Sequence, residues 1–267
     1  MLDLWAEERY EEALMIARRL VDEPGYWCAA AALATAHSQG LGGTERDLGQ
    51  AERLHRRAAA SGALTARYDL ARFLLNQRQG EAAARREAVT LLADLAQARY
   101  AAAMLLLARF DPSELPPNAR RDRPVLWIEE AARIGHPTAL FMVGSFQYAP
   151  GYRGSAPGPR AAFERAARGG QPMAALELAH GIRDGRLAGE GSESLAWAAR
   201  TEAMIVRGGV LYGEDLLDRE RLAARAAAFL DEAPPESAAA ARADARRWVE
   251  DEMSVWPTEE TLPCPAR

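Results

Sequence analysis

The chain has 267 residues, 49% of them hydrophobic, which is enough to bury a full-sized core or to build an extended repeat array. Its formal net charge is −5, from 33 basic and 38 acidic residues, and no unbroken basic stripe suited to nucleic-acid binding occurs. No stretch approaches the roughly 20 consecutive apolar residues of a membrane-spanning helix, so we expect no membrane span.

The N-terminal segment, residues 1–24, is predicted to form a capping helix. Between Trp5 and Val21, apolar side chains such as Leu14 and Ala17 fall mainly on one helical face, and Pro24 follows the segment. The first ten residues are rich in charge and contain no apolar run, so the sequence as given shows no signal peptide. We therefore expect a cytoplasmic location by default, or a periplasmic one if a leader sequence has been removed.

The cysteines and histidines are sparse and far apart in the sequence. Cys28 lies near the start and Cys264 lies in the C-terminal tail, so we expect neither a disulfide framework nor a paired-cysteine metal site. The four histidines match no metal-ligand spacing: His37, His55, His136 and His180. We therefore expect no metal and no cofactor.

A repeat of 35 to 38 residues starts at Ala29. In its first copy, which ends at Gly62, an Ala-rich helix is followed by a glycine turn and a second helix that Asp47 can cap. We place the first alanine of the later copies at Ala66, Ala101, Ala139 and Ala174, and one packing position at Leu33, Leu70, Leu105, Val143 and Leu178. A period of this length is typical of one helical hairpin per repeat.

These residues resemble the Sel1-like repeat family, a relative of the tetratricopeptide repeat with the pattern A-xxx-LG-xx-Y-xx-G before its turn. The resemblance covers about two-thirds of the chain, from Ala29 to Gly209. It implies an all-α fold, a right-handed α-solenoid of about five hairpins with capping helices at both ends. We expect repeats over 25–209, a C-terminal helical cap over 210–255 with helices at Leu216–Leu230 and Ser237–Met253, and a loose tail over 256–267.

The resemblance also implies which side chains line the concave face. In related repeats these are one position before the first alanine and positions two, six, nine and ten after it. This frame selects small residues such as Cys28 and Thr35, as well as Leu107. It also selects the aromatic, histidine and arginine residues that we predict to bind a partner: Tyr68, Arg72, Tyr100, Phe110, Phe141, Tyr148, His180 and Arg183.

Aromatic and arginine side chains are favoured in protein-binding hot spots, which supports a binding surface. A second interpretation stays open, in which the rings pack against each other and never meet a partner. Three further aromatic residues on second helices are predicted to be core: Trp127, Phe163 and Trp197. The loops 111–123 and 149–159 are either tolerated variation or a second contact surface around Tyr152 and Arg153.

We found no GxSxG, Walker or GxGxxG motif in the sequence. We therefore expect a non-enzymatic scaffold or adaptor that binds another protein, either an adaptor client or a secreted toxin that it neutralises as an immunity protein. The alternative is a hydrolase acting on peptidoglycan or a β-lactam, for which His180, Arg183 and Asp184 form a candidate cluster that lacks a partner for catalysis. The sequence does not predict the oligomeric state.

Overall fold

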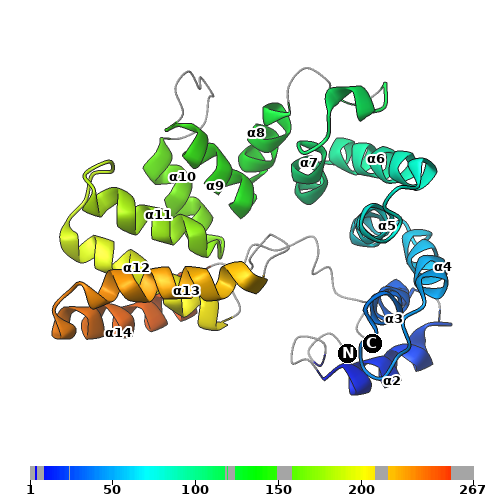
Figure 1. The fold of residues 1–267 in the computed structure, drawn as a ribbon, viewed down its shortest axis with the longest axis horizontal. Helices are drawn as coiled ribbons and strands as arrows, with labels where there is room; N and C mark the ends of the chain where they lie inside the picture. The colour runs from blue at the N-terminus through cyan, green and yellow to red at the C-terminus, as the bar shows by residue number, and fades with distance from the viewer. Residues whose placement is uncertain are drawn as a thin grey trace. The chain divides into compact units, whose positions relative to one another are not determined.

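The computed structural model describes residues 4, 9–23, 25–117, 119, 124–148, 158–207 and 216–253, and these residues are helical with connecting turns. Within them we find thirteen α-helices, one short 3-10 helix and no strand (Figure 1). The chain divides into two compact units: unit 1 comprises residues 1–124 and 257–267, and unit 2 comprises residues 125–256. None of the described helices is long and apolar enough to cross a membrane.

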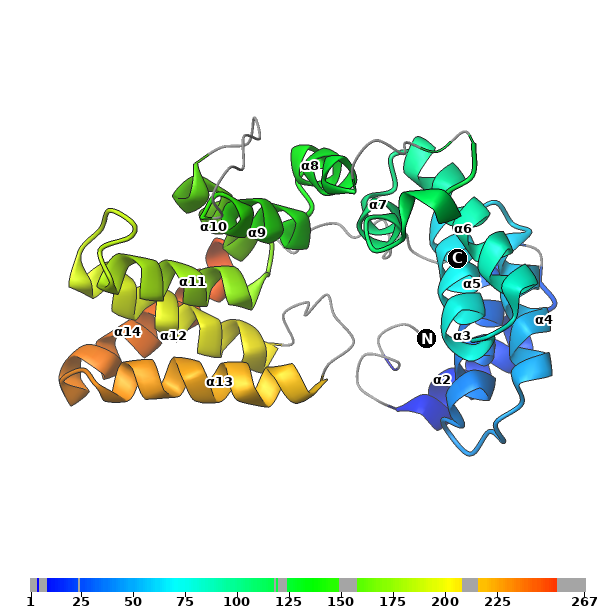
Figure 2. The same cartoon turned by 45° about the horizontal axis from the view of Figure 1, so that its top comes forward.

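Unit 1 is a series of antiparallel hairpins. Its helices are α2 (Tyr10–Leu20), α3 (Trp27–Gln39), α4 (Leu48–Ala59), α5 (Leu64–Gln77), α6 (Ala82–Gln97) and α7 (Ala101–Leu107), followed by the 3-10 helix η1 (Pro112–Glu114). Each helix from α2 to α7 packs on the next, and α3 also contacts α5 (Figure 2). In unit 1 the first helices α3 and α5 of neighbouring hairpins therefore lie side by side. The helix α2 lies within residues 1–24, for which we predicted a capping helix, whereas Trp5 lies outside the described residues.

Unit 2 continues the same construction. Its helices are α8 (Val125–Ile134), α9 (Pro137–Phe146), α10 (Pro159–Arg168), α11 (Pro172–Arg183), α12 (Gly191–Arg207), α13 (Leu216–Asp231) and α14 (Pro235–Asp251). The helix α12 packs against α11, α13 and α14. The two helices expected after the repeats are therefore α13 and α14. Trp127, Phe163 and Trp197 are buried, as predicted for second-helix core positions.

Local sequence signals start and end these helices. The Asp47 carboxylate accepts a hydrogen bond from the Gln50 backbone N–H at 2.9 Å, so Asp47 caps α4 as expected. Proline occupies the first turn of α9, α10, α11 and α14, where no intrahelical N–H bond is lost. Alanine makes up about half of the buried hydrophobic residues, which lets neighbouring helices approach closely.

A residue with positive φ separates each repeat from the one before it. Four residues later comes the first alanine of the repeat, and in every case this alanine is fully buried. The positive-φ residues are Gly25, Gly62, Arg99, Gly135 and Gly170, and the alanines are Ala29, Ala66, Ala103, Ala139 and Ala174. The left-handed conformation is easily adopted by glycine and costs other residues about 1–2 kcal/mol.

The third repeat therefore starts at Ala103, and the prediction of Ala101 is wrong by two residues. Leu107 is fully buried in the position that we assigned to Leu105, while Leu105 is half-buried. The cause lies at Arg99, which adopts φ 64° where the other repeats have glycine. Without a glycine to mark the boundary, the run of alanines after Tyr100 gave two possible registers.

Candidate partner-binding surface

The corrected register shows which side chains occupy equivalent places on the first helices. Two residues after the first alanine lie Tyr68, Leu105 and Phe141, and all three are half-buried. Six residues after it lie Arg72 in α5 and Arg109 at the end of α7, and both are exposed. Neither arginine forms an ion pair within the described part of the chain. The first-helix side of unit 1 therefore presents a half-buried apolar row next to two exposed cations.

Tyr68 and Arg72 form a contact pair on α5. The Arg72 guanidinium lies 5.8 Å from the centre of the Tyr68 ring, within the range of a cation–π interaction. The Tyr68 ring in turn lies 5.3 Å from the Tyr100 ring at a tilt of 51°. Tyr100 is only 1% exposed, so the prediction that it lies partly open to a partner is wrong. It occupies the N-cap of α7, because the third repeat starts later than its sequence suggested.

Phe110 is also buried, with 7% of its surface exposed, although we predicted it to line the groove. The guanidinium of Arg85, from α6, covers its ring at 4.8 Å. The Glu114 carboxylate holds that guanidinium at 2.6 Å and raises the pKa of Arg85. The ion pair between Arg85 and Glu114 therefore links α6 to η1 and holds the Arg85 guanidinium over the Phe110 ring.

In unit 2, Phe141 and Tyr148 both pack against one buried ring, that of Phe163. Their ring centres lie 5.9 Å and 6.1 Å from that of Phe163, which is fully buried in α10. Phe141 is half-buried and Tyr148 is 39% exposed. The guanidinium of Arg186 lies 5.4 Å from the Tyr148 ring. Burial raises the pKa of the Tyr148 hydroxyl, so that this side chain stays a neutral hydrogen-bonding group.

His180 and Arg183 belong to a second cluster, between α11 and α13. The His180 ring meets the Phe229 ring edge-on at 5.1 Å, and the Arg183 guanidinium lies over the same Phe229 ring at 4.3 Å. Arg183 also contacts Glu232 at 3.0 Å and the Nδ1 atom of His180 at 3.0 Å. Burial and the neighbouring Arg183 lower the pKa of His180.

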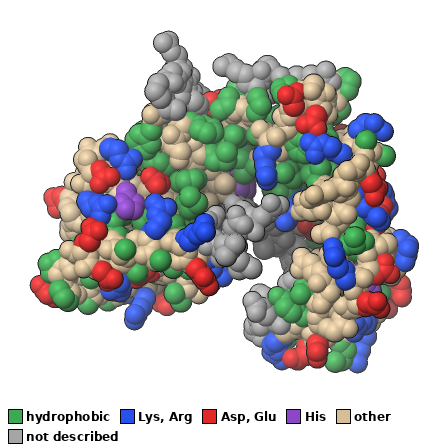
Figure 3. All heavy atoms as spheres, in the orientation of Figure 1, with side chains coloured by type: hydrophobic (Ala, Val, Ile, Leu, Met, Phe, Trp, Pro, Cys, Tyr) green, Lys and Arg blue, Asp and Glu red, His purple; other side chains and the backbone are tan. Residues whose placement is uncertain are grey.

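Sequence reasoning missed Phe229 because α13 follows the repeats and its residues were assigned to no groove position. Figure 3 shows a histidine and charged side chains of both signs gathered over α11 on this face of unit 2. The groups around His180 are Arg183, Asp184, Phe229 and the more distant charges of Glu177 and Arg225. The Asp184 carboxylate lies 3.4 Å from the guanidinium groups of both Arg183 and Arg186, so paired charges of both signs lie beside the His180 ring.

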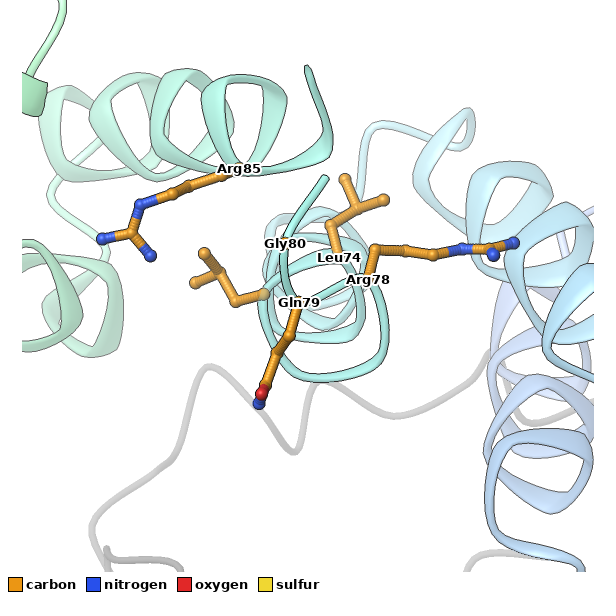
Figure 4. A pocket seen from close by; sticks show the side chains of 6 residues that line it. Leu74, Arg78, Gln79, Gly80 and Arg85 are labelled. Carbon is orange, nitrogen blue, oxygen red and sulfur yellow. The ribbon is translucent and has the colours of Figure 1, made fainter. Parts of the chain in front are cut away.

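A small hollow lies at the end of α5 (Figure 4). It measures about 330 Å³ and is lined by Leu74, Leu75, Arg78, Gln79, Gly80 and Arg85. The Arg78 and Arg85 side chains point away from each other in Figure 4. Arg78 binds the Glu52 carboxylate at 2.8 Å, and Arg85 binds Glu114. Because both cations are directed outward and already paired, the hollow offers no converging polar groups for a small ligand.

Cys28 is disulfide-bonded, although the two cysteines of the sequence led us to expect no disulfide framework. It lies in the first turn of α3, and its side chain is 6% exposed. Cys264 lies outside the described residues, as do Tyr152 and Arg153 of the proposed second contact surface. Among the described residues no group of three or more His, Cys, Asp or Glu is placed to hold a metal ion.

No family model matches the sequence, and a comparison with curated proteins also found no match. Solved structures do match. A Sel1 repeat protein from Oxalobacter formigenes aligns with a TM-score of 0.56 at 16% identity, over 85% of this chain and 97% of its own. The protective antigen c5321 of uropathogenic Escherichia coli, described as displaying an SLR fold, aligns with a TM-score of 0.57 at 18% identity, over 92% of this chain and 50% of its own.

Both alignments extend over most of the chain. In each unit the buried first alanines, each four residues after a residue with positive φ, also recur as expected for helical repeats. At these identities the similarity establishes the fold and leaves the binding residues to be argued from this chain alone. The chain is a helical repeat protein with the Sel1-like repeat fold.

Proposed function

We propose that this protein is a non-enzymatic scaffold that binds a partner protein on the side formed by the first helices of its repeats. The observation that supports this most directly is the recurrence of an arginine over an exposed or half-buried aromatic ring on that side. It occurs at Arg72 over Tyr68 in unit 1 and at Arg186 over Tyr148 in unit 2. Such pairs offer a large, pre-ordered contact area at low entropy cost.

The charge distribution of the helices supports the same side. Three of the five first helices, α3, α7 and α9, contain no Asp, Glu or Arg residue, and α5 and α11 carry three and two, whereas the second helices α4, α6, α8 and α10 carry three or four each. The centres of protein interfaces are depleted in charge and enriched in aromatic residues and arginine. A surface with few charges costs less to desolvate, so the first-helix side suits a protein partner better than the second-helix side.

Two partner classes follow from the resemblance to Sel1-like repeats: an adaptor client, or a secreted toxin that the protein neutralises. The disulfide at Cys28 favours an oxidising compartment such as the periplasm for this protein. In the cluster around His180 the Asp184 carboxylate is paired with Arg183 and Arg186, so we propose binding and not hydrolysis of peptidoglycan or a β-lactam. Purification of the protein from its native host and identification of the bound chain would separate client from toxin.

The binding surface is tested by substitution at its two aromatic centres. Replacing both Tyr68 and Tyr148 with Ala should weaken the partner's affinity by more than about 2 kcal/mol, the scale of interface hot spots. Arg86→Ala serves as the control, because Arg86 is exposed on the second helix α6. Isothermal titration with the co-purified partner, together with circular dichroism of each variant, measures this. An affinity unchanged in the double variant, with helicity intact, would exclude this surface.

A further inference from the structure

One acidic side chain on a first helix of unit 2 lacks a counterion. Glu177 lies in the middle of α11 and is half-buried, and it forms no ion pair and no side-chain hydrogen bond within the described part of the chain. Seven half-buried carboxylates elsewhere in the described helices each form an ion pair with an arginine, as Glu193 does with Arg160 and Glu202 does with Arg242. Glu177 is therefore an exception to the way this chain treats its half-buried acids.

The arginines around Glu177 are engaged elsewhere. Arg183 contacts Glu232 at 3.0 Å and Asp184 at 3.4 Å. Arg186 contacts the other oxygen of Asp184, also at 3.4 Å. A half-buried carboxylate has lost part of its hydration, and without a cation nothing offsets that loss. Because both neighbouring guanidinium groups already have acidic partners, Glu177 stays open to a cation from outside the chain.

The Tyr148 side chain lies near this carboxylate. Burial raises the pKa of the Tyr148 hydroxyl, the charge of Arg186 lowers it and the charge of Glu177 raises it, so both charges act on this group. Tyr148 is 39% exposed, its ring is supported by the buried Phe163 ring, and its hydroxyl forms no hydrogen bond within the described residues. The neighbouring first helices α9 and α11 thus provide a neutral oxygen and a carboxylate that can both accept hydrogen bonds.

We propose that Glu177 and Tyr148 form a subsite for a basic side chain, lysine or arginine, of the partner protein. This inference rests on the proposed function, because it names the chemistry that the partner presents to the first-helix side of unit 2. The ammonium or guanidinium group donates hydrogen bonds to the Glu177 carboxylate and to the Tyr148 hydroxyl oxygen. The aliphatic stem of the same side chain lies along the Tyr148 ring.

Charge favours a basic group over an acidic one at this place. The remaining cation of the region, Arg225, is exposed on α13 and acts on His180 from there. Salt screens exposed charges beyond about 8–10 Å, whereas a half-buried charge such as that of Glu177 is screened much less. The attraction by Glu177 therefore outweighs the repulsion by Arg225. An acidic side chain would be repelled by the one carboxylate that nothing neutralises.

The subsite is tested first without the partner, with three blocked peptides as probes. They are acetyl-Ala-Arg-Ala-amide, acetyl-Ala-Lys-Ala-amide and, as the neutral comparison, acetyl-Ala-Gln-Ala-amide. In protein with labelled tyrosine rings, the nuclear magnetic resonance signal that disappears in Tyr148→Phe identifies Tyr148. The two basic peptides should shift this signal, and the neutral peptide should shift it about two- to fivefold less at equal concentration, the effect of one exposed ion pair.

The isosteric variant Glu177→Gln removes the charge and should reduce the shift by the basic peptides to that by the neutral one. Glu250→Gln is the matched control, because Glu250 is exposed on the second helix α14 and has no ion pair within the described residues. It should leave the shifts unchanged. Equal shifts by basic and neutral peptides in the wild type would overturn the proposal, and so would equal shifts in the wild type and in Glu177→Gln.

The second test uses the co-purified partner and isothermal titration. Glu177→Gln should weaken the affinity about tenfold, because docking excludes water from the ion pair, and about 0.5 M sodium chloride should reduce this difference. Glu250→Gln should have no effect. An affinity that is unchanged in Glu177→Gln but lost when Tyr68 and Tyr148 are both replaced by Ala would overturn the subsite and leave the proposed function standing. An affinity unchanged in both would contradict the proposed function as well.

Discussion

The Tyr100 ring packs 5.3 Å from the Tyr68 ring, yet only Tyr68 reaches the surface of unit 1. The two rings therefore have different roles, although one groove pattern selected both. Tyr100, at the N-cap of α7, is the buried ring that supports Tyr68. Tyr68 is the ring that a partner can reach, and the Arg72 guanidinium lies over it. A contact of this kind makes the exposed ring rigid, which lowers the entropy cost of binding.

Tyr100→Ala should destabilise the protein by about 3–5 kcal/mol, because it removes a fully buried aromatic side chain and leaves a cavity. Tyr68→Ala should cost clearly less, because the Tyr68 side chain is half-buried and surrounding water can fill the space. Urea unfolding of the two variants measures both values. Equal losses of stability would contradict the separate roles assigned to the two rings.

The repeat boundaries give a second prediction, which concerns backbone conformation. Gly62 has φ +83°, and a Cβ atom added there would meet no atom within 4 Å. Gly62→Ala should therefore cost about 1 kcal/mol from the left-handed conformation alone. Arg99→Gly should act in the opposite direction and stabilise the protein by up to about 1 kcal/mol, because Arg99 holds φ 64° without being glycine.

Gly191→Ala is the control for the Gly62 change. Gly191 also has open space around it, has no positive φ, and begins the helix α12. Thermal unfolding should show no loss of stability for it. Equal losses of stability in Gly62→Ala and Gly191→Ala would show that the positive φ at Gly62 is not important for the boundary between repeats.

The fold could be predicted from the sequence to a large extent, because its signals are local and repeated. Buried alanines at a period near 36 residues, proline at helix starts and the Asp47 cap all describe hairpins without reference to distant contacts. The register of the third repeat could not be predicted in this way. Its boundary residue, Arg99, carries no glycine signature, and only the backbone conformation reveals it.

The exposure of the aromatic residues was less predictable. Phe110 is hidden by Arg85, which lies 25 residues earlier in the sequence, and the cover depends on the ion pair that Arg85 forms with Glu114. Phe229, which holds both His180 and Arg183, belongs to a helix beyond the repeats. These contacts join helices whose positions the repeat pattern does not relate to each other. A repeat motif therefore cannot predict them.

Gly144 gives a third prediction, which concerns close packing. A Cβ atom on Gly144 would lie 2.7 Å from the Phe163 ring, which is itself fully buried. Replacing a helical glycine with alanine ordinarily stabilises a helix by about 1 kcal/mol. Here the added methyl has no room, so Gly144→Ala should instead destabilise unit 2 by about 1–3 kcal/mol.

The double variant Gly144→Ala with Phe163→Leu separates packing from helix propensity. The smaller leucine side chain leaves space for the methyl, so the two changes together should cost less than the sum of their separate costs. Urea unfolding of the four proteins of this cycle measures the difference. Strict additivity would show that the Phe163 ring does not require glycine at position 144.

Two buried histidines predict how stability depends on pH. His55 is 5% exposed in α4, with its ring 4.9 Å from Phe73, and His136 is 3% exposed at the N-cap of α9. Burial lowers the pKa of each from its ordinary value of 6.5 to about 4. Between these values the unfolded chain binds a proton at each histidine while the folded protein does not.

The folded protein should therefore have its full stability above about pH 6.5 and lose stability as the pH falls toward 4. By pH 5 each histidine should have cost about 2 kcal/mol. Carboxylates with lowered pKa, such as those of Asp47 and Glu52, add to the loss mainly below their ordinary values of 3.8 and 4.5. The range from pH 6.5 to 5 therefore reports on the histidines.

The measurement is urea unfolding at pH 7, 6 and 5 of the wild type and of the variant in which His55 and His136 are both replaced by Leu. The wild type should lose about 4 kcal/mol over this range, and the variant should lose much less, because the only imidazole with a lowered pKa that it keeps is the less buried one of His180. The comparison uses the change of the unfolding free energy with pH and not its value at pH 7. A change in packing that shifts the stability equally at every pH therefore does not affect it. A wild type whose stability stays flat from pH 7 to 5 would mean that these two rings are already accessible to protons in the folded protein.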